Sequence, residues 1–319
     1  GIICPMQQTQ KTQTVTFHTI TANETGQRID NFLLRRLKGI PKTRIYRIIR
    51  KGEVRVNKKR IKPEYKLHQD DIVRIPPVQM EEEKPQKKAP DSLLKLVKKA
   101  IIFENEHLIA INKPAGLAVH GGSHSELGLI EILRQLRSDR EYLELAHRLD
   151  METSGVLLIA KSREMLRNLH TLFRDAHKIE KHYTALVAGK WQGGEQRITH
   201  KLERKQDRNQ KVQVSEDGKS STSIFTPIRH CKNATLMDIQ ILTGRMHQIR
   251  TQLSYLGHPI IGDEKYGDEK QNRYFARHCG SKRLFLHASS LSFETEDKKY
   301  KLETPLPSEL QQVVSFLDK

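Results

Sequence analysis

The chain has 319 residues, a formal net charge of +18 and three cysteines. This length predicts two compact units, because single domains usually hold about 100 to 200 residues. The absence of a long apolar run or signal-peptide pattern excludes a membrane protein, and three widely spaced cysteines exclude a disulfide framework, so we expect a cytoplasmic protein. With no glycine-rich phosphate loop, CxxC or HxxxH, neither a nucleotide cofactor nor a metal is expected.

Residues 1–25 are polar and rich in Gln and Thr, which predicts a flexible tail with at most a short strand at residues 14–17. In residues 27–38 the apolar side chains recur at helical spacing, and Gly39 provides a stop. Pro41 suits the first turn of a second helix, which would bury Ile45, Ile48 and Ile49 and display cations elsewhere.

Residues 26–75 hold 16 Lys or Arg and 5 Asp or Glu, a net +11. A strand is predicted at 53–57, a basic turn at 57–60 and a closing strand at 71–75. Such a charge block indicates a polyanionic partner, although a solvated face that binds nothing is the alternative. An anionic membrane surface is disfavoured because the cationic helix has no Trp or Phe anchor. The candidate contact residues are Lys42, Arg44, Arg47, Arg50, Lys51, Lys58, Lys59 and Arg60.

The segments GQRID (26–30) and KGEVRVN (51–57) resemble the S4-type RNA-binding domain. The resemblance implies a small α/β domain, at residues 26–75, that recognises structured RNA by shape and phosphate. The charge block independently favours the same kind of partner.

Four prolines and an acidic run within residues 76–91 predict an extended linker, so the two units are expected to reorient freely. A second domain would then occupy residues 92–319. Its predicted helices are 92–99, 129–137 and 164–177, and its predicted strands are 108–112, 156–160, 183–188, 223–228, 234–242 and 284–287. Strands and helices follow no regular alternation, which favours a mixed α+β fold over a doubly wound one.

Asp150 lies in a turn just before the apolar residues 156–160, which predict a buried strand. A carboxylate on so rigid a support, next to Arg148, is a candidate nucleophile or base acting on an anionic substrate. The plain alternative is a structural Asp, because Asp, Ser, Thr and Gly are ordinary turn residues.

HRLD at 147–150 and TSG at 153–155 resemble the signature of the family of RNA pseudouridine synthases that modify large-subunit ribosomal RNA. Three further segments match the family in the same order: 103–116 (FENEHLIAINKPAG), 181–183 (KHY) and 243–250 (TGRMHQIR), the last followed by 257–263 (GHPIIGD). The resemblance implies a mixed, largely antiparallel-sheet catalytic domain. Met246 departs from the small hydroxyl residue often found there, which bears on local packing.

The resemblance also implies the site. Asp150 would be catalytic, Tyr183 would lie against the target base, and Arg250 would pair with Asp150 and keep it ionised. Without the resemblance, Tyr183 would be read as an ordinary core tyrosine of a strand.

Arg148 would fill the gap left by a flipped base or hold phosphate. His147 and Lys113 complete the residues predicted to serve RNA binding, His147 mainly by orienting the loop. For Lys113 a merely solvated turn lysine is the alternative.

The implied reaction converts uridine to pseudouridine in large-subunit (23S) rRNA, without cofactor, by a monomer. Asp150 would attack the ribose or remove its C2′ proton, and these routes stay open. A non-catalytic RNA-binding assembly factor would not need Asp150, Tyr183 and Arg250 together. A nucleosidase or glycosidase would need a second carboxylate, for which Glu152 is the nearby candidate.

Overall fold

The computed structural model describes residues 14–78, 87–122, 127–140, 142–296 and 298–318. The chain divides into two compact units, Gly1–Gln86 and Lys87–Lys319. Both ends of the predicted linker 76–91 belong to folded structure, because Val78 is buried in the first unit's core and Ala89 in the second's. Residues 79–86, the middle of that prediction, lie outside the described residues.

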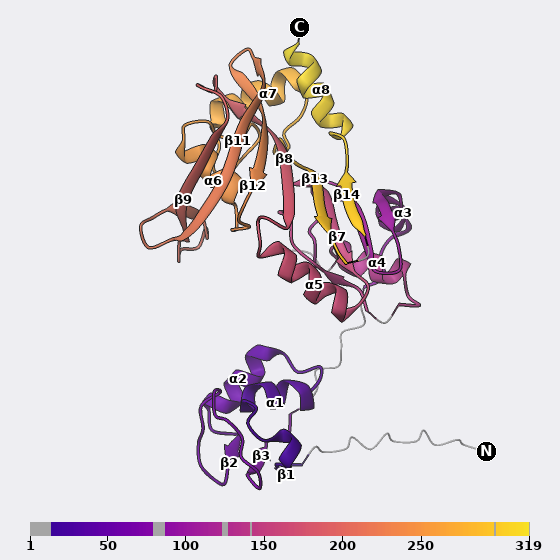
Figure 1. Ribbon diagram of the computed structural model, residues 1–319, viewed down its shortest axis with the longest axis vertical. Helices are drawn as coiled ribbons and strands as arrows, with labels where there is room; N and C mark the ends of the chain where they lie inside the picture. Colours follow the sequence, from indigo (N-terminus) through magenta and orange to yellow (C-terminus); the bar gives the residue numbers. More distant parts are fainter. Residues whose placement is uncertain (1–13, 79–86, 123–126, 141, 297, 319) are drawn as a thin grey trace, which may run out of the picture. The chain divides into compact units, whose positions relative to one another are not determined.

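The first unit packs two helices on a small antiparallel sheet (Figure 1). The helices are α1 (Ile29–Arg36) and α2 (Lys42–Arg50), and the strands lie in the order β1 (Thr16–Thr19), β3 (Ile72–Ile75), β2 (Arg55–Val56). As predicted, α2 buries Ile45, Ile48 and Ile49 and leaves most of its cations exposed. Apolar side chains at helical spacing thus face the core, where their burial stabilises the unit.

The flexible tail predicted for residues 1–25 ends earlier than expected. Strand β1 pairs with β3 from Thr16↔Ile75 to Thr19↔Ile72, Ile20 is buried in the core, and a 3₁₀ turn, η1 (Ala22–Glu24), follows. The short strand predicted at residues 14–17 overlaps β1, but the tail was extended too far, because main-chain hydrogen bonds hold an edge strand whatever the polarity of its side chains. Residues 1–13 lie outside the described residues.

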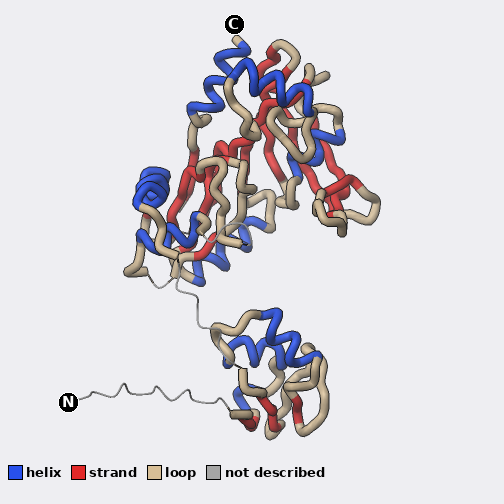
Figure 2. The backbone as a smooth tube through the Cα atoms, turned by 180° about the vertical axis from the view of Figure 1, so that it is seen from behind, coloured by secondary structure: helices blue, strands red, loops and turns tan. Residues whose placement is uncertain are grey.

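The second unit is built on one sheet of eleven strands, which Figure 2 shows in red between the helices. Its main path runs β10-β9-β11-β12-β8-β13-β7-β5-β4, with β14 beside β13 and β6 beside β7. Among the described residues β13–β7 is the parallel pair, and the other pairs are antiparallel. The predicted mixed, largely antiparallel fold is therefore confirmed. The strands are β4 (Ile101–Glu104), β5 (Leu108–Lys113), β6 (Glu144–Leu145), β7 (Ser154–Ala160), β8 (Ile179–Ala188), β9 (Gln196–Arg204), β10 (Val212–Val214), β11 (Lys219–Cys231), β12 (Ala234–Ile241), β13 (Leu286–Glu294) and β14 (Lys299–Glu303).

Strand β7 is apolar throughout because helices pack against both faces of the sheet. Leu157 and Ile159 enter a cluster with α3 (Asp91–Ala100) and α4 (Leu129–Leu136), whereas Leu158 enters a cluster with α5 (Arg163–Phe173). Because successive strand residues point to opposite faces, a strand covered on both sides needs apolar residues throughout. Asp150 therefore precedes a fully buried, rigid strand.

Helices α6 (Gln248–Tyr255), α7 (Glu269–Cys279) and α8 (Ser308–Leu317) pack with β8, β11 and β12. The sequence predictions omitted these helices, and also strands β4, β6, β9, β10 and β14. Strand β9 is polar, and its seven-residue pairing with β11 supplies main-chain hydrogen bonds that hydropathy does not reveal. None of the helices in the described part of the chain is long and apolar enough to cross a membrane.

Candidate active site

A cleft of about 1250 Å³ opens in the second unit. Its walls come from segments far apart in sequence: the turn before β7, the end of α5, the start of β8 and the loop that leads into α6. Asp150, Tyr183 and Arg250 all line this cleft. The fold therefore brings the three residues predicted to be catalytic into one site.

The turn that carries Asp150 is held by the main chain on both sides. Thr153 N–H donates to the Asp150 carbonyl at 3.0 Å, and Gly116 N–H donates to the Met151 carbonyl at 2.8 Å. Gly155 then has φ +118°, and a Cβ there would lie 2.2 Å from the carbonyl oxygen of Ala288. Only glycine allows β7 to approach β13 so closely, which explains the TSG part of the motif.

A buried polar network anchors the other end of the turn. The Ser154 hydroxyl lies 2.8 Å from His287 Nδ1 and accepts from Arg283 at 3.1 Å. His287 Nε2 lies 3.1 Å from the Thr304 carbonyl, so Nε2 carries the proton and Nδ1 accepts from Ser154. Burial lowers the pKa of His287, which agrees with this neutral form. The sequence predictions assigned Arg283 and His287 no role.

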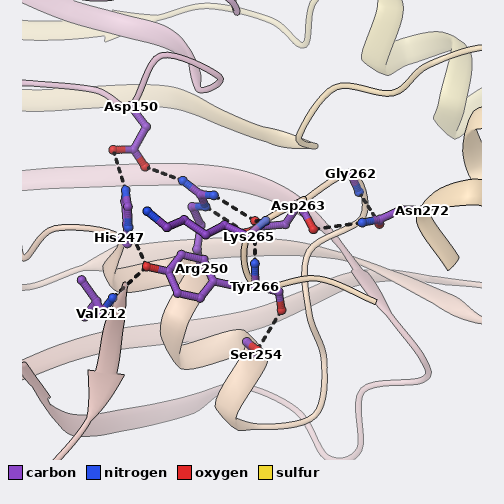
Figure 3. A network of polar contacts seen from close by, with 10 residues as sticks. All are labelled: Asp150, Val212, His247, Arg250, Ser254, Gly262, Asp263, Lys265, Tyr266 and Asn272. Atoms are coloured by element: carbon purple, nitrogen blue, oxygen red, sulfur yellow. Dashed lines mark hydrogen bonds and ion pairs between the residues drawn. The ribbon is translucent and has the colours of Figure 1, made fainter. Parts of the chain in front are cut away.

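Figure 3 shows the carboxylate of Asp150 between two partners, Arg250 and His247. Arg250 Nη1 donates to Asp150 Oδ2 at 3.3 Å. The other edge of the guanidinium is held by Asp263, with Nε and Nη2 donating at 2.8 and 2.9 Å. Burial alone would lower the pKa of Arg250, but Asp263 and then Asp150 raise it above its ordinary value. Arg250 is thus a fixed cation beside Asp150.

Asp263 is itself firmly held. Its Oδ1 also accepts from the main-chain N–H of Lys265 and of Tyr266, both at 3.0 Å, and its side chain is 1% exposed. The Asp150 side chain, by contrast, is 33% exposed and faces the cleft. Asp263 lies in the segment GHPIIGD, but sequence reasoning gave it no role. Its neighbours in the chain give no signal of burial, because the charged residues Glu264 and Lys265 follow it directly.

His247 reaches the other oxygen of the same carboxylate. Its Nε2 lies 3.7 Å from Asp150 Oδ1, and its Nδ1 lies 2.7 Å from the Tyr266 hydroxyl, which also accepts from Val212 N–H. Burial lowers the pKa of His247, against an opposing effect of Asp150. His247 immediately precedes α6 and has a left-handed backbone with φ 53°. This uncommon conformation positions its ring. Sequence reasoning missed His247 as a site residue.

Tyr183 lies in the wall of the cleft. Burial raises the pKa of its hydroxyl, and the charge of Asp150 raises it further, so the phenol stays neutral. Its ring packs with apolar residues of two clusters, among them Leu149 and Leu286. A neutral aromatic in an apolar wall is suited to stacking against a base.

Arg148 and His147 occupy different environments. Arg148 is exposed at the cleft. His147 accepts from Leu158 N–H through Nε2 at 2.9 Å, and burial lowers its pKa to about 3. Because this nitrogen is taken by the main chain, the structure favours the loop-orienting role of His147 over an RNA contact.

Lys113 does not face RNA, and its predicted RNA-binding role is wrong. Its side chain is fully buried, and Nζ donates to the carbonyls of Pro114, Leu117 and Met151 at 2.8, 2.9 and 2.9 Å. All three donors of the ammonium are used, although burial lowers its pKa to about 7. Lys113 instead joins the loop that contains Pro114 and Leu117 to the turn of Asp150.

Lys113→Met should destabilise the second unit, because the carbonyls of Pro114, Leu117 and Met151 lose the ammonium donor, although that of Met151 still accepts from Gly116 N–H. We expect the free energy of unfolding to fall by about 2–4 kcal/mol. Urea unfolding can be followed by the fluorescence of the single tryptophan, Trp191, which is buried in this unit. Lys95→Met on the exposed face of α3 is the control. Unchanged stability combined with weaker RNA binding would restore the predicted RNA contact.

The basic residues predicted to bind RNA in the first unit lie on α2 and on the turn after β2. Apart from the half-buried Arg44, their side chains are exposed, and none of these seven has a carboxylate partner among the residues described. The turn has positive φ at Asn57 and Lys58, which form its tip, whereas Lys59 pairs with Val56 and begins the returning side. In the described ranges no group of three His, Cys, Asp or Glu could hold a metal ion.

Two family profiles match the chain. That of the RNA pseudouridylate synthases covers residues 107–255, and that of the S4 domain covers residues 27–73. Curated relatives include "Ribosomal large subunit pseudouridine synthase C" of Haemophilus influenzae, 50% identical over 280 residues (86% of each chain). The same-named proteins of Escherichia coli and Pasteurella multocida are 49% and 46% identical, over 89% and 96% of this chain and 90% and 94% of theirs.

Solved structures agree with this fold. "Human RNA Pseudouridylate Synthase Domain Containing 4" is 25% identical and superimposes with a TM-score of 0.60, over 71% of this chain and 96% of its own. "Human RNA Pseudouridylate Synthase Domain Containing 1", at 24% identity and a TM-score of 0.58, covers 72% of this chain and 98% of its own.

Proposed function

Because the chain belongs to the RNA pseudouridylate synthase family, we propose that it isomerises uridine to pseudouridine in large-subunit ribosomal RNA, with Asp150 as the essential carboxylate. The names of the relatives support the substrate class. The observation that carries the assignment of Asp150 is its position in the cleft, next to Tyr183 and held by the Arg250–Asp263 pair.

In the proposed reaction the bond between C1′ and N1 breaks and a bond between C1′ and C5 forms. The proton of C5 is lost to solvent and N1 gains a proton, so no cofactor is consumed. Asp150 would either form an adduct at the ribose or remove its C2′ proton, and both routes need the ionised carboxylate. The fixed charge of Arg250, at 3.3 Å, stabilises that anion.

The target uridine has to leave its stack to reach Asp150, at a cost of a few kcal/mol. Tyr183 offers a stacking surface, worth about 1–3 kcal/mol per base. Arg148, exposed at the cleft, is the residue we assign to the vacated position or to a neighbouring phosphate. The two residues would together offset the cost of extrusion.

The first unit, which matches the S4 domain, would hold structured RNA. Its exposed cations on α2 and on the turn at residues 57–60 support phosphate contacts rather than base-specific contacts. In this proposal binding by the first unit depends strongly on salt, whereas the second unit carries the chemistry.

The test is tritium release from in vitro transcribed rRNA labelled with 5-[³H]uridine. Wild-type protein should release tritium from large-subunit RNA much faster than from small-subunit RNA, and sequencing should locate pseudouridine at the reacted sites. Equal release from both RNAs would contradict the substrate class. Tight binding without release would favour the non-catalytic assembly factor.

A further inference from the structure

Lys181, at the start of β8, is a half-buried cation for which the described part of the chain offers no hydrogen-bond acceptor or carboxylate partner. Its Nζ lies 4.8 Å from the centroid of the Phe173 ring and 3.8 Å from the position that a Cβ would take on Gly244. Burial lowers the pKa of Lys181, and its charge helps to depress the pKa of the neighbouring His147. A partly desolvated ammonium without a protein acceptor can bind a ligand that supplies one.

Lys181 faces the cleft. Side chains two apart on a strand share a face, so Lys181 and Tyr183 line the same wall, with their Cα atoms roughly 7 Å apart. One nucleotide spans such a distance. A base stacked on Tyr183 would therefore leave its own or the adjacent phosphate within reach of Lys181.

The positive charges near Lys181 favour an anionic ligand. The cleft residues that neighbour it are Phe173 and Gly244, followed along the chain by the exposed Arg174 and Arg245. Tyr183, by contrast, packs against an apolar cluster, two members of which, Leu286 and Ile249, also line the cleft. A cationic region next to an apolar one matches the two parts of a nucleotide, phosphate and base.

Lys113 is the natural comparison, because it is a buried lysine near the cleft. Its ammonium donates to three main-chain carbonyls, which is how a structural lysine is satisfied. Lys181 has only an aromatic ring beside it. This contrast shows that Lys181 lacks the contacts of a stabilising residue.

We propose that Lys181 is a phosphate-binding residue of the cleft, which holds the backbone of the target nucleotide while its base lies on Tyr183. The proposal rests on the proposed RNA pseudouridylation. It makes Lys181 a substrate-binding residue, distinct from the Asp150–Arg250 pair. In the free protein the Lys181 ammonium lacks a hydrogen-bond acceptor, which lowers the stability of the fold. This is common for groups whose hydrogen bonds are completed only in the complex.

The test uses the full chain with Lys181→Met, which keeps the stem and removes the charge, and Lys178→Met as the control. Lys178 is exposed, lies just before β8 and is not part of the cleft wall. Three quantities are measured: unfolding by Trp191 fluorescence, tritium release, and the dissociation constant of unlabelled large-subunit rRNA by filter binding at several KCl concentrations.

For Lys181→Met we expect about a tenfold increase in KM and in the dissociation constant, the size of one lost charge-assisted hydrogen bond. The slope of log affinity against log salt should become shallower by about 0.7–0.9, as for one phosphate contact. Stability should be unchanged or higher, because a desolvated charge is removed. Lys178→Met should leave all three quantities near wild type.

Lower stability with unchanged RNA affinity would overturn the proposal and make Lys181 structural. A decrease in kcat alone, with an unchanged slope of log affinity against log salt, would also overturn the proposal. Lys181 would then contact the uncharged uracil and not a phosphate. Failure of the wild type to release tritium would contradict the proposed function instead, whereas the binding and stability measurements would still decide the role of Lys181.

Discussion

Asp150→Asn should reduce tritium release by about 10⁴-fold or more, because the amide neither attacks the ribose nor removes a proton. Its shape is retained, and the amide oxygen can still accept from Arg250, so binding of large-subunit rRNA should change little. Single-turnover tritium release and filter binding measure the two effects separately. Stability should fall only slightly, since the Asp150 side chain is 33% exposed.

Glu152→Gln is the matched control for Asp150→Asn. Glu152 is an exposed carboxylate in the same turn. A pseudouridine synthase needs only Asp150, so this variant should keep most of its activity. A glycosidase would require a second carboxylate, and equal losses from both substitutions would therefore revive that alternative. Full activity of Asp150→Asn would remove Asp150 from the mechanism.

Asp263→Asn should impair both stability and activity, although Asp263 is not itself among the residues that line the cleft. The Asn oxygen can still accept from Lys265 and Tyr266 N–H, but its NH₂ group then faces the guanidinium of Arg250, donor against donor. Breaking a buried ion pair on one side costs about 3–5 kcal/mol. Released from its bidentate partner, Arg250 would no longer be fixed beside Asp150, so kcat should fall by about 10²-fold.

Trp191 fluorescence in urea and single-turnover tritium release, at a temperature where the variant is folded, measure these effects. Asp268→Asn is the matched control, because Asp268 caps α7 at the surface by accepting from Gln271 N–H, and Asn caps equally well. It should resemble wild type. Normal stability and kcat in Asp263→Asn would show that Asp150 alone fixes Arg250.

The predictions from sequence were most successful where a residue's environment is set by its neighbours in the chain. The run 156–160 was predicted as a buried strand and is the body of β7, and the isoleucines of α2 face the core as their spacing indicated. The pairing of Arg250 with Asp150, 100 residues apart, came from the resemblance of two short segments to a known family. Spacing and hydropathy could not have supplied it.

The failures concern contacts made across the fold. Lys113 was read as an exposed turn lysine, but three carbonyls from two loops enclose its ammonium. The end of the predicted tail became strand β1 because β3 offered an edge to pair with. Asp263 received no role because its partner, Arg250, lies 13 residues away on α6.

The sequence by itself determined a basic unit suited to a polyanion, followed by a mixed α+β unit, and it determined that Asp150 stands at a turn before a buried strand. These properties follow from charge density, periodicity and local turn chemistry, which are encoded over a few residues. Only the tertiary structure decided which polar side chains are satisfied by partners and which face the cleft unpaired. The Met151 carbonyl that completes the contacts of Lys113 and the carboxylates that hold Arg250 lie elsewhere in the chain, and only folding brings them together.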